Sequence, residues 1–407
     1  MRPLTTTALV RGFENGADYW RLVEPFTLAR ECGHDCYAAV RGKPLTHPPD
    51  ILVFRGEFFK TDGPWSWSGF LAQCEADKVL VVLDYDDAYQ EWDKYRDDQA
   101  QVDACKAAAQ HAHLVTTTTH RLAQEIADFA GRYDVAVVEN AIRLESWRHL
   151  SPPDPEHPLI VVAGGDSHGK DWEQVPDIFR AIARQHPTVH FRVAGYDPGW
   201  GPDLKSDLGD RIELRTFERF AEYPRSAFQA ASLVLAPLAD SVFNRNRSPI
   251  RHWEATAAGA AFIGSPILYH QSVMQGETGI LCSDTDSYVD FSLALLADET
   301  RRSRMVSLAR QHVRDHALTP DAVNARFDLY YRAWQARYNP DGRLSDGTSA
   351  ISSLWTPESA RGGADSKPGY RPVLDRDGDG RKRGLRIVTP TRRDAAIRGG
   401  GRQQPVQ

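Results

Sequence analysis

Short apolar runs alternate with amphipathic segments along the first 340 residues of the chain. Continuous apolar runs of four to six residues are typical of strands buried on both faces of a parallel sheet. The segment 18–31 between two such runs keeps near-helical spacing of its apolar positions and therefore predicts a helix. The repeated order of strand and helix predicts doubly wound parallel sheets. The clearest apolar runs are 50–55, 79–83, 159–163 and 233–238.

The chain divides at residues 151–158, where four of eight residues are proline. Proline removes a backbone donor and fixes φ, so this stretch continues neither a helix nor a sheet. We therefore predict one Rossmann-like domain over 1–150 and a second over 151–318. A last helix, dense in aromatic residues, is expected at about 319–338. Residues 339–407 are rich in Gly, Arg, Asp, Ser and Pro, and we expect a disordered tail there.

Composition narrows the class of protein. Hydrophobic residues make up 41% of the 407 residues, with ten Trp and sixteen Phe, which is typical of a globular chain. A net charge of −6 gives no electrostatic case for nucleic acid as an obligatory partner. The five cysteines are scattered and favour a reducing cytosol over a zinc site. No apolar run is long enough to span a membrane, and the N-terminus lacks the apolar core of a signal peptide. We expect a cytoplasmic protein with at most peripheral membrane contact.

The stretch 243–266 carries the clearest candidate chemistry. It follows the apolar run 233–238, and we expect Arg247, Ser248 and Arg251 in the first turn of a helix that ends at Gly259. Unpaired N–H groups and cationic side chains at a helix start suit a diphosphate. In such a site Glu254 would accept hydrogen bonds from sugar or ribose hydroxyls. The alternative is an ordinary helix with a solvated Arg251–Glu254 pair.

A second glycine-containing loop follows the run 159–163. Gly164, Gly165 and Gly169 lack the dinucleotide-binding spacing, and no Ser or Thr follows Lys170 as a P-loop requires. A strand followed by a glycine turn still predicts a phosphate-facing loop. Lys170 would offset diphosphate charge. Gly164, Gly165, His168 and Asp171 are candidate substrate contacts, although a histidine without a special role fits His168 equally well.

The stretch 244–259 resembles the nucleotide-binding signature of GT-B glycosyltransferases, especially the family-4-like retaining enzymes. The matching positions are Asn244, Arg247, Ser248, Arg251, Glu254, Ala255, Ala257 and Gly259. The resemblance extends less sharply over about 20–335. It implies two Rossmann-like domains that face a central cleft, and a last helix (319–338) that packs back on the first domain. It also implies hexosyl transfer from a nucleotide-diphosphate sugar, with retention and without a resident cofactor.

The resemblance also implies roles for particular residues. Lys170, Arg247 and Glu254 become the expected catalytic groups, while Asn244, Ser248 and Arg251 become expected donor contacts. The segment 17–25 looks like the first helix of the same group, which makes Arg21 a candidate acceptor or phosphate contact. One departure is Asn246, which stands where better-known members have the first of two glutamates. The acceptor stays open: a glycan, a lipid-linked glycan, a protein or a nucleic acid.

An acidic cluster follows the run 79–83. Asp84, Asp86 and Asp87 fall at the carboxyl end of a predicted strand, where ligands gather in open α/β sheets. We expect them to cap the next helix or to face the acceptor, with Asp86 as the candidate contact. A divalent metal is the alternative. If transfer inverts the sugar, these three carboxylates are the candidate bases.

Three other functions remain open at the level of sequence. A non-catalytic nucleotide-sugar-binding subunit is favoured by Asn246. A sugar-nucleotide epimerase on the same fold would turn over donor without an acceptor. An NAD-dependent oxidoreductase is disfavoured because neither half has a full dinucleotide fingerprint.

Overall fold

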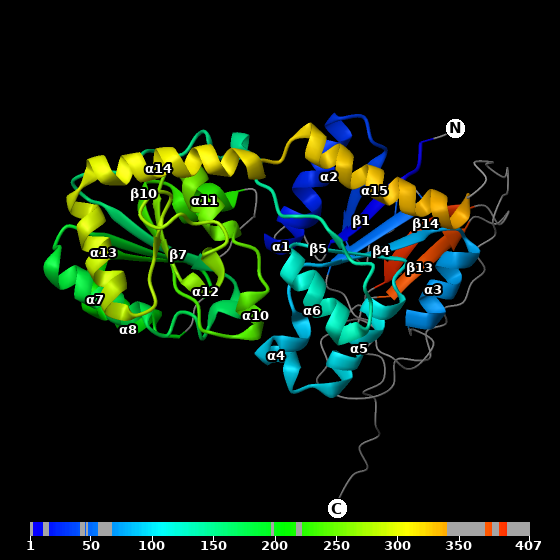
Figure 1. Cartoon of the computed structure of the whole chain (residues 1–407), viewed down its shortest axis with the longest axis horizontal. Coiled ribbons are helices and arrows are strands. Elements are labelled where there is room, and N and C mark those ends of the chain that lie inside the picture. Colours follow the sequence, from blue (N-terminus) through cyan, green and yellow to red (C-terminus); the bar gives the residue numbers. More distant parts are fainter. Residues whose placement is uncertain are drawn as a thin grey trace, which may run out of the picture.

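The computed structural model describes residues 3–10, 16–40, 45, 48–55, 67–196, 199–216 and 222–339, with two further strands at 371–376 and 382–388. The described residues up to 339 form two lobes that lie side by side, each built on a six-stranded parallel sheet (Figure 1). Helices cover the faces of both sheets, as expected from the alternation of strands and helices along the chain.

The first lobe has the strand order β2-β1-β3-β4-β5-β6. The four central strands β1, β3, β4 and β5 are buried throughout, which explains their continuous apolar runs, whereas the edge strands β2 and β6 are mostly of intermediate exposure. The strands are β1 (Thr6–Val10), β2 (Cys36–Val40), β3 (Ile51–Arg55), β4 (Leu80–Tyr85), β5 (Leu114–Thr117) and β6 (Ala136–Val137). The helices are α1 (Gly16–Asp18), α2 (Glu24–Glu31), α3 (Trp67–Ala76), α4 (Asp93–Arg96), α5 (Gln99–His111) and α6 (His120–Ala130), with a π-helical turn η1 (Tyr19–Val23) between α1 and α2.

The second lobe has the strand order β12-β11-β10-β7-β8-β9. Counted within the lobe this is the doubly wound order that reverses between its first and fourth strands, here β7 and β10. The strands are β7 (Leu159–Gly164), β8 (His190–Gly195), β9 (Ile212–Arg215), β10 (Ala231–Ala236), β11 (Ala261–Gly264) and β12 (Ile280–Leu281). The helices are α7 (Val175–Gln185), α8 (Gly201–Leu208), α9 (Tyr223–Phe228), α10 (Val242–Arg245), α11 (Ile250–Ala258), α12 (Pro266–Tyr269), α13 (Thr285–Ala297) and α14 (Glu299–Val313).

Three helix starts differ from the sequence prediction. The polar, alanine-containing stretch 90–110 predicts one helix, but the structure interrupts it, and α5 begins at Gln99 with the Asp98 side chain accepting from the backbone N–H of Gln101. The glycine turn at 164–169 predicts a helix start directly after it, but α7 begins only at Val175. Arg247 and Ser248 precede α11 instead of lying in its first turn, because Pro249 stands at its N-cap and removes one helical donor. The end of α11 at Gly259 agrees with the prediction, with φ at 85°.

The last helix of the second half returns to the first lobe. After α14 the chain crosses over, and α15 (Pro320–Tyr338) lies alongside α2 (Figure 1). Phe327 is fully buried against Phe26, with ring centroids 5.1 Å apart. The indole N–H of Trp334 donates to the carbonyl of Lys78 at 2.9 Å. These contacts make α15 part of the first lobe's core.

Two observations concern the tail and membranes. Strands β13 (Arg371–Arg376) and β14 (Lys382–Val388) pair antiparallel within the segment expected to be disordered, and the rest of that segment lies outside the described residues. Among the described helices, none combines the length and the apolar character needed to cross a bilayer.

Candidate functional site

The candidate site lies at the point where the strand order of the second sheet reverses. β7 and β10 are neighbours, so the segments that follow them leave the same edge of the sheet side by side. We call residues 165–174 the β7 loop and residues 237–249 the β10 loop. Crevices outside the carboxyl ends of strands at such a reversal are where open α/β sheets bind ligands.

Asp171 fastens the two loops to each other. Its Oδ1 accepts from the backbone N–H of Ala239 at 2.9 Å and from Nδ2 of Asn244 at 2.7 Å, and its Oδ2 lies 2.8 Å from Nδ1 of His168. Burial alone would raise the pKa of Asp171, but its hydrogen bonds, that of His168 foremost, hold the pKa below its ordinary value. Asp171 therefore acts as an ionised anchor of the loops, with its oxygens already engaged by the protein.

His168 packs tightly at the start of the β7 loop. Its ring is stacked on Trp172 with centroids 5.7 Å apart, and a methyl group at Gly164 would meet the ring at 2.3 Å. Burial, assisted by the charge of Arg247, lowers the pKa of His168 to about 4. The imidazole is therefore neutral near pH 7. With Nδ1–H donating to Asp171, Nε2 is an acceptor, so it suits a hydroxyl better than a phosphate oxygen.

The β10 loop carries three buried polar atoms without a hydrogen-bond partner. They are Oδ1 of Asn244, Oδ1 of Asn246 and Nη1 of Arg247. Asn244 and Asn246 are 3% and 1% exposed. Buried polar atoms are normally satisfied, so three such atoms within four residues indicate a place where a polar ligand binds.

Glu254 is enclosed rather than open to a cleft. It is 1% exposed, pairs with Arg251 and receives a hydrogen bond from Trp20 of the first lobe. Burial raises the pKa of Glu254 to about 6, with Arg251 opposing the rise. Arg251 also donates to the hydroxyl of Tyr223. A hydroxyl can therefore reach Glu254 only if the Trp20 side chain moves aside.

Side chains from the first lobe contact both loops of the second. Nζ of Lys170 lies 2.8 Å from Oδ2 of Asp93, and Nζ of Lys94 lies 3.1 Å from Oδ2 of Asp166. Trp92 stacks on Phe243 with ring centroids 5.9 Å apart. The Lys170 side chain is 67% exposed, so it lies at the rim of the lobe interface.

Two polar contacts cross the interface deeper inside. Nδ2 of Asn140 donates to Oγ of Ser248 at 2.5 Å. Nδ2 of Asn246 donates to Oε2 of Glu125 at 3.3 Å. Asn246 stands where the resembling enzymes have a glutamate, and Glu125 on α6 thus brings a carboxylate to that position from the other lobe.

Buried arginines hold two of the three carboxylates that follow β4. Arg21 donates to both oxygens of Asp84, at 2.7 and 2.6 Å, and Arg55 reaches Asp86 at 3.0 Å. Asp87 instead faces the second lobe, where its Oδ1 lies 3.6 Å from Nε of Arg247. Within the described part of the chain, no three His, Cys, Asp or Glu side chains gather closely enough to hold a metal.

Arg21 does not have the exposure that a substrate contact needs. It is 1% exposed, and besides Asp84 it donates to the carbonyl of Val138 at 2.6 Å and to Oδ1 of Asn140 at 3.1 Å. Its guanidinium holds the carboxyl ends of β4 and β6 together, and through Asn140 it supports Ser248. This geometry favours a positioning role over the predicted contact.

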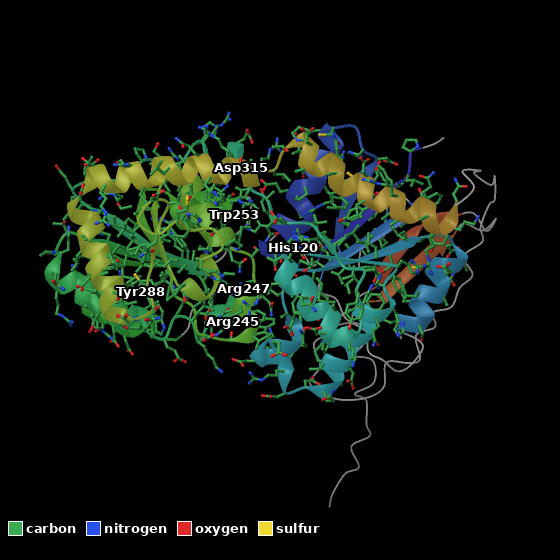
Figure 2. The ribbon with its side chains drawn as sticks, viewed as in Figure 1. His120, Arg245, Arg247, Trp253, Tyr288 and Asp315 are labelled. Carbon is green, nitrogen blue, oxygen red and sulfur yellow. The ribbon has the colours of Figure 1, made fainter. Side chains whose placement is uncertain are left out.

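The structure therefore separates the predicted residues into groups. It brings His168, Asp171, Asn244 and Arg247 together at the sheet reversal. It places Lys170 at the rim, Glu254 and Arg251 in an enclosed pair, and Arg21 and Asp86 inside the first lobe. Figure 2 shows Arg247 on the side of the second lobe that faces the first.

Sequence reasoning missed three residues of the first lobe that contact this site. Trp20, Glu125 and Asn140 were not singled out as site residues, yet each contacts the β10 loop or α11. Only Asn140 carried a signal, since the apolar run 135–138 predicts a strand and Asn140 follows its carboxyl end. The contacts of Trp20 and Glu125 depend on how the two lobes face each other. The spacing of residues within one lobe does not show this.

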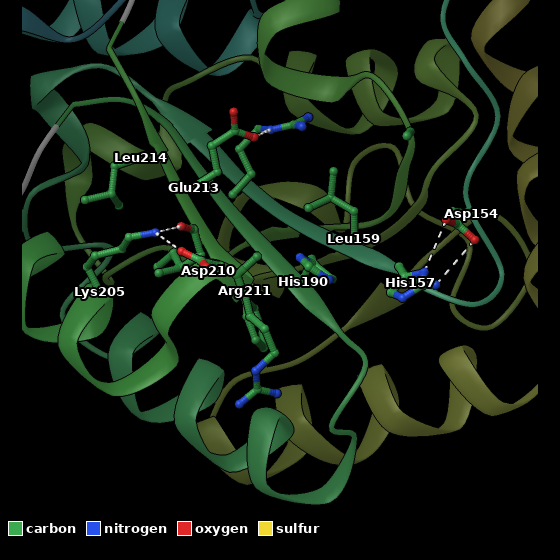
Figure 3. A pocket seen from close by; sticks show the side chains of 13 residues that line it. Asp154, His157, Leu159, His190, Lys205, Asp210, Arg211, Glu213 and Leu214 are labelled. Carbon is green, nitrogen blue, oxygen red and sulfur yellow. Dashed lines mark hydrogen bonds and ion pairs between the residues drawn. The ribbon is translucent and has the colours of Figure 1, made fainter.

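A separate depression of about 830 Å³ lies at the opposite edge of the second sheet (Figure 3). Leu159, His190 and Ile212, which begin three of its strands, line the floor. Several of its charged groups pair with one another, as Lys205 does with Asp210 at 3.6 Å. Because it lies at the amino ends of the strands, it is not part of the candidate site.

The match to a known family falls on the second lobe. The family model described as "Glycosyl transferases group 1" matches residues 157–298. This range contains both loops and Glu254. A search of curated proteins gives no match.

Solved structures confirm the predicted GT-B fold. Sucrose-phosphate synthase from Thermosynechococcus elongatus superimposes with a TM-score of 0.61 at 15% identity, over 82% of this chain and 99% of that one. HepE from Anabaena, solved with UDP and glucose, gives a TM-score of 0.59 at 12% identity, over 81% of this chain and all of that one. A glycosyltransferase from Rickettsia africae gives 0.57 at 12% identity, over 82% of this chain and 99% of that one. The chain has the GT-B fold, and its residues 157–298 match the glycosyltransferase group 1 model.

Proposed function

We propose that the protein transfers a sugar, a hexose by resemblance, from a nucleotide-diphosphate sugar to an acceptor hydroxyl. The observation that carries the proposal is the set of unpartnered buried atoms on Asn244, Asn246 and Arg247, at the sheet reversal of a domain that matches glycosyltransferases. A cation with a free buried donor, beside neutral amide acceptors, suits a diphosphate flanked by sugar hydroxyls.

In this proposal the diphosphate lies between the β7 and β10 loops. Arg247 neutralises the charge that develops as the diphosphate leaves, and Lys170 at the rim adds to it once the ion pair with Asp93 opens. Preorganised charge at a leaving group is commonly the largest catalytic contribution. Glu254 accepts hydrogen bonds from ribose or sugar hydroxyls after Trp20 withdraws. The absence of a resident cofactor is a proposal that rests on the family resemblance, which also implies retention.

The binding-only alternative keeps one specific observation in its favour. Glu254 is enclosed by Arg251 and Trp20, and the position of the first glutamate holds Asn246. In a protein that only binds the nucleotide sugar, Glu254 would stay enclosed in this way at all times. Turnover therefore decides between the two functions.

A panel of UDP-, GDP-, ADP- and TDP-glucose tests the proposal. UDP-glucose comes first because HepE was also solved with that donor. We expect one of these donors to raise the melting temperature, since it binds only the folded state, and to release its nucleoside diphosphate in the presence of an acceptor. EDTA should leave the rate unchanged, because arginine and lysine supply the positive charge. Binding without any nucleotide release from any donor would contradict the proposal.

A further inference from the structure

Asp87 differs from the two carboxylates that precede it in the chain. Asp84 and Asp86 are engaged within the first lobe by Arg21 and Arg55. The Asp87 side chain is 22% exposed and reaches across the lobe interface towards Arg247. Asp87 therefore lies where the first lobe, the expected acceptor side, faces Arg247, the residue proposed to hold the diphosphate.

We propose that Asp87 is the base that accepts the proton of the acceptor hydroxyl, and that donor binding frees it for this step by taking Arg247 away from it. The proposal rests on the proposed sugar transfer, and it takes the inverting course instead of the retention that the family resemblance implies. It assigns the role of base to one of three carboxylates that the sequence left as equal candidates for that role.

The geometry of the Arg247–Asp87 pair is that of a loose ion pair, so Arg247 can exchange Asp87 for another anion. The separation of 3.6 Å exceeds a direct hydrogen bond, whereas Arg21 holds Asp84 at 2.6 Å. Arg247 also keeps Nη1 buried without a partner. A diphosphate carries more negative charge than one carboxylate and can engage several guanidinium donors, so it competes well for Arg247.

The charges around Asp87 set its pKa in a range that suits a base. Burial raises the pKa of Asp87 to about 6, Arg247 and Arg55 oppose the rise, and Asp86 adds to it. Once a diphosphate neutralises Arg247, the strongest opposing charge is cancelled and the pKa of Asp87 rises further. A base with a pKa just below the working pH is the efficient choice.

The chemical step balances without a further reactant. The acceptor oxygen forms a bond to the anomeric carbon of the donor sugar, and its proton passes to Asp87. The bond between the anomeric carbon and the phosphate oxygen breaks, and its electron pair leaves with the diphosphate. Arg247 holds that charge, and the proton on Asp87 is lost to solvent when the products dissociate.

The test uses water as the acceptor, because a base acts on any hydroxyl. Release of nucleoside diphosphate from the preferred member of the glucose donor panel is followed between pH 5 and 9 for the wild type, Asp87→Asn and Asp87→Glu. In the wild type, kcat/KM for the donor should decline below about pH 6, where Asp87 of the free protein becomes protonated. We call this decline the acid limb. The acid limb of kcat should lie at higher pH, since kcat reports the donor complex. Asp87→Asn should lower kcat about 10²- to 10³-fold and lose the acid limb. Asp87→Glu should restore the limb.

Asp93→Asn is the matched control, because it removes a carboxylate that also pairs with a cation across the interface. It should keep the acid limb. Asp87→Asn should bind the nucleoside diphosphate as tightly as the wild type or more tightly, since Arg247 loses its competitor. Undiminished kcat with the acid limb intact in Asp87→Asn overturns the proposal, and so does weaker diphosphate binding. A wild type that binds donor without releasing nucleotide overturns the proposed function as well, so the two failures are distinguishable.

Discussion

Three arginines near the lobe interface show how the surroundings of a side chain decide its use. A guanidinium carries five N–H donors and stays charged, so its role depends on which of them are engaged. Arg21 is held by Asp84, Val138 and Asn140, and Arg251 by Glu254 and Tyr223. Arg247 has one loose ion pair and a buried donor without a partner. We infer that Arg247 is the member available to an anionic ligand.

At the residue scale, replacing Glu254 should separate binding from folding. Glu254→Gln keeps an acceptor for Arg251, so we expect a folded protein. Its charge-assisted hydrogen bonds to donor hydroxyls are lost, and we expect nucleotide release to fall roughly 10- to 100-fold, which corresponds to about 1.4–2.7 kcal/mol. Release of nucleoside diphosphate and the melting temperature are the measurements. The exposed Glu277→Ala serves as the control. Wild-type turnover in a folded Glu254→Gln would show that Glu254 does not contact the donor.

At the scale of elements, the site depends on two loops that one carboxylate ties together. Asp171 belongs to the β7 loop and holds Ala239 and Asn244 of the β10 loop. This tie supports the β7 loop, because α7 begins only at Val175 and the loop itself holds just a short 3-10 helix, Asp166–His168. The anchored loops can keep Arg247 close to His168 without a bound ligand.

Glycines 164 and 165 give a matched pair of predictions on the β7 loop. A methyl group at Gly164 would collide with the ring of His168, which Asp171 and Trp172 hold in place, so Gly164→Ala should destabilise the fold by about 1–3 kcal/mol. A methyl group at Gly165 meets no atom within 4 Å, so Gly165→Ala should keep the melting temperature. It should weaken diphosphate binding, because the methyl group occupies the space proposed for phosphate. Thermal unfolding and calorimetric titration with UDP test both. Equal stability of the two variants would contradict this account of the loop.

The strands and their loops could be predicted from sequence because buried parallel strands are continuous apolar runs. β4 and β7 fall within one or two residues of their expected positions. The start of α11 was misplaced, since residues 246–249 have no local signal strong enough to show that Pro249 is the N-cap. Arg251 and Glu254 do pair, as the solvated-pair alternative proposed, but the pair is not solvated. Glu254 is buried beneath Trp20, and the Arg251 side chain is only 13% exposed and bonds to Tyr223.

At the scale of the whole molecule, the second lobe's candidate loops meet the first lobe directly. Lys170, Ser248 and Arg247 contact Asp93, Asn140 and Asp87 respectively. The chain also crosses between the lobes twice, and α15 anchors the second crossing by packing beside α2. None of these contacts follows from periodicity within one domain, which is why the lobe interface could not be derived from sequence. We infer that a donor must separate these contacts to enter, so donor binding and lobe opening are coupled.

The most direct test of the account is calorimetric titration of Arg247→Ala and Arg245→Ala with UDP, GDP, ADP and TDP. The two arginines lie two residues apart, but Arg245 is 43% exposed and pairs with Asp240 at 2.6 Å, whereas Arg247 faces the first lobe (Figure 2). Loss of a charge-assisted contact to the diphosphate should weaken binding of the preferred nucleotide about 10- to 100-fold in Arg247→Ala. Arg245→Ala should bind like the wild type. Unchanged affinity in Arg247→Ala would contradict the claim that a diphosphate binds at the reversal of the second sheet.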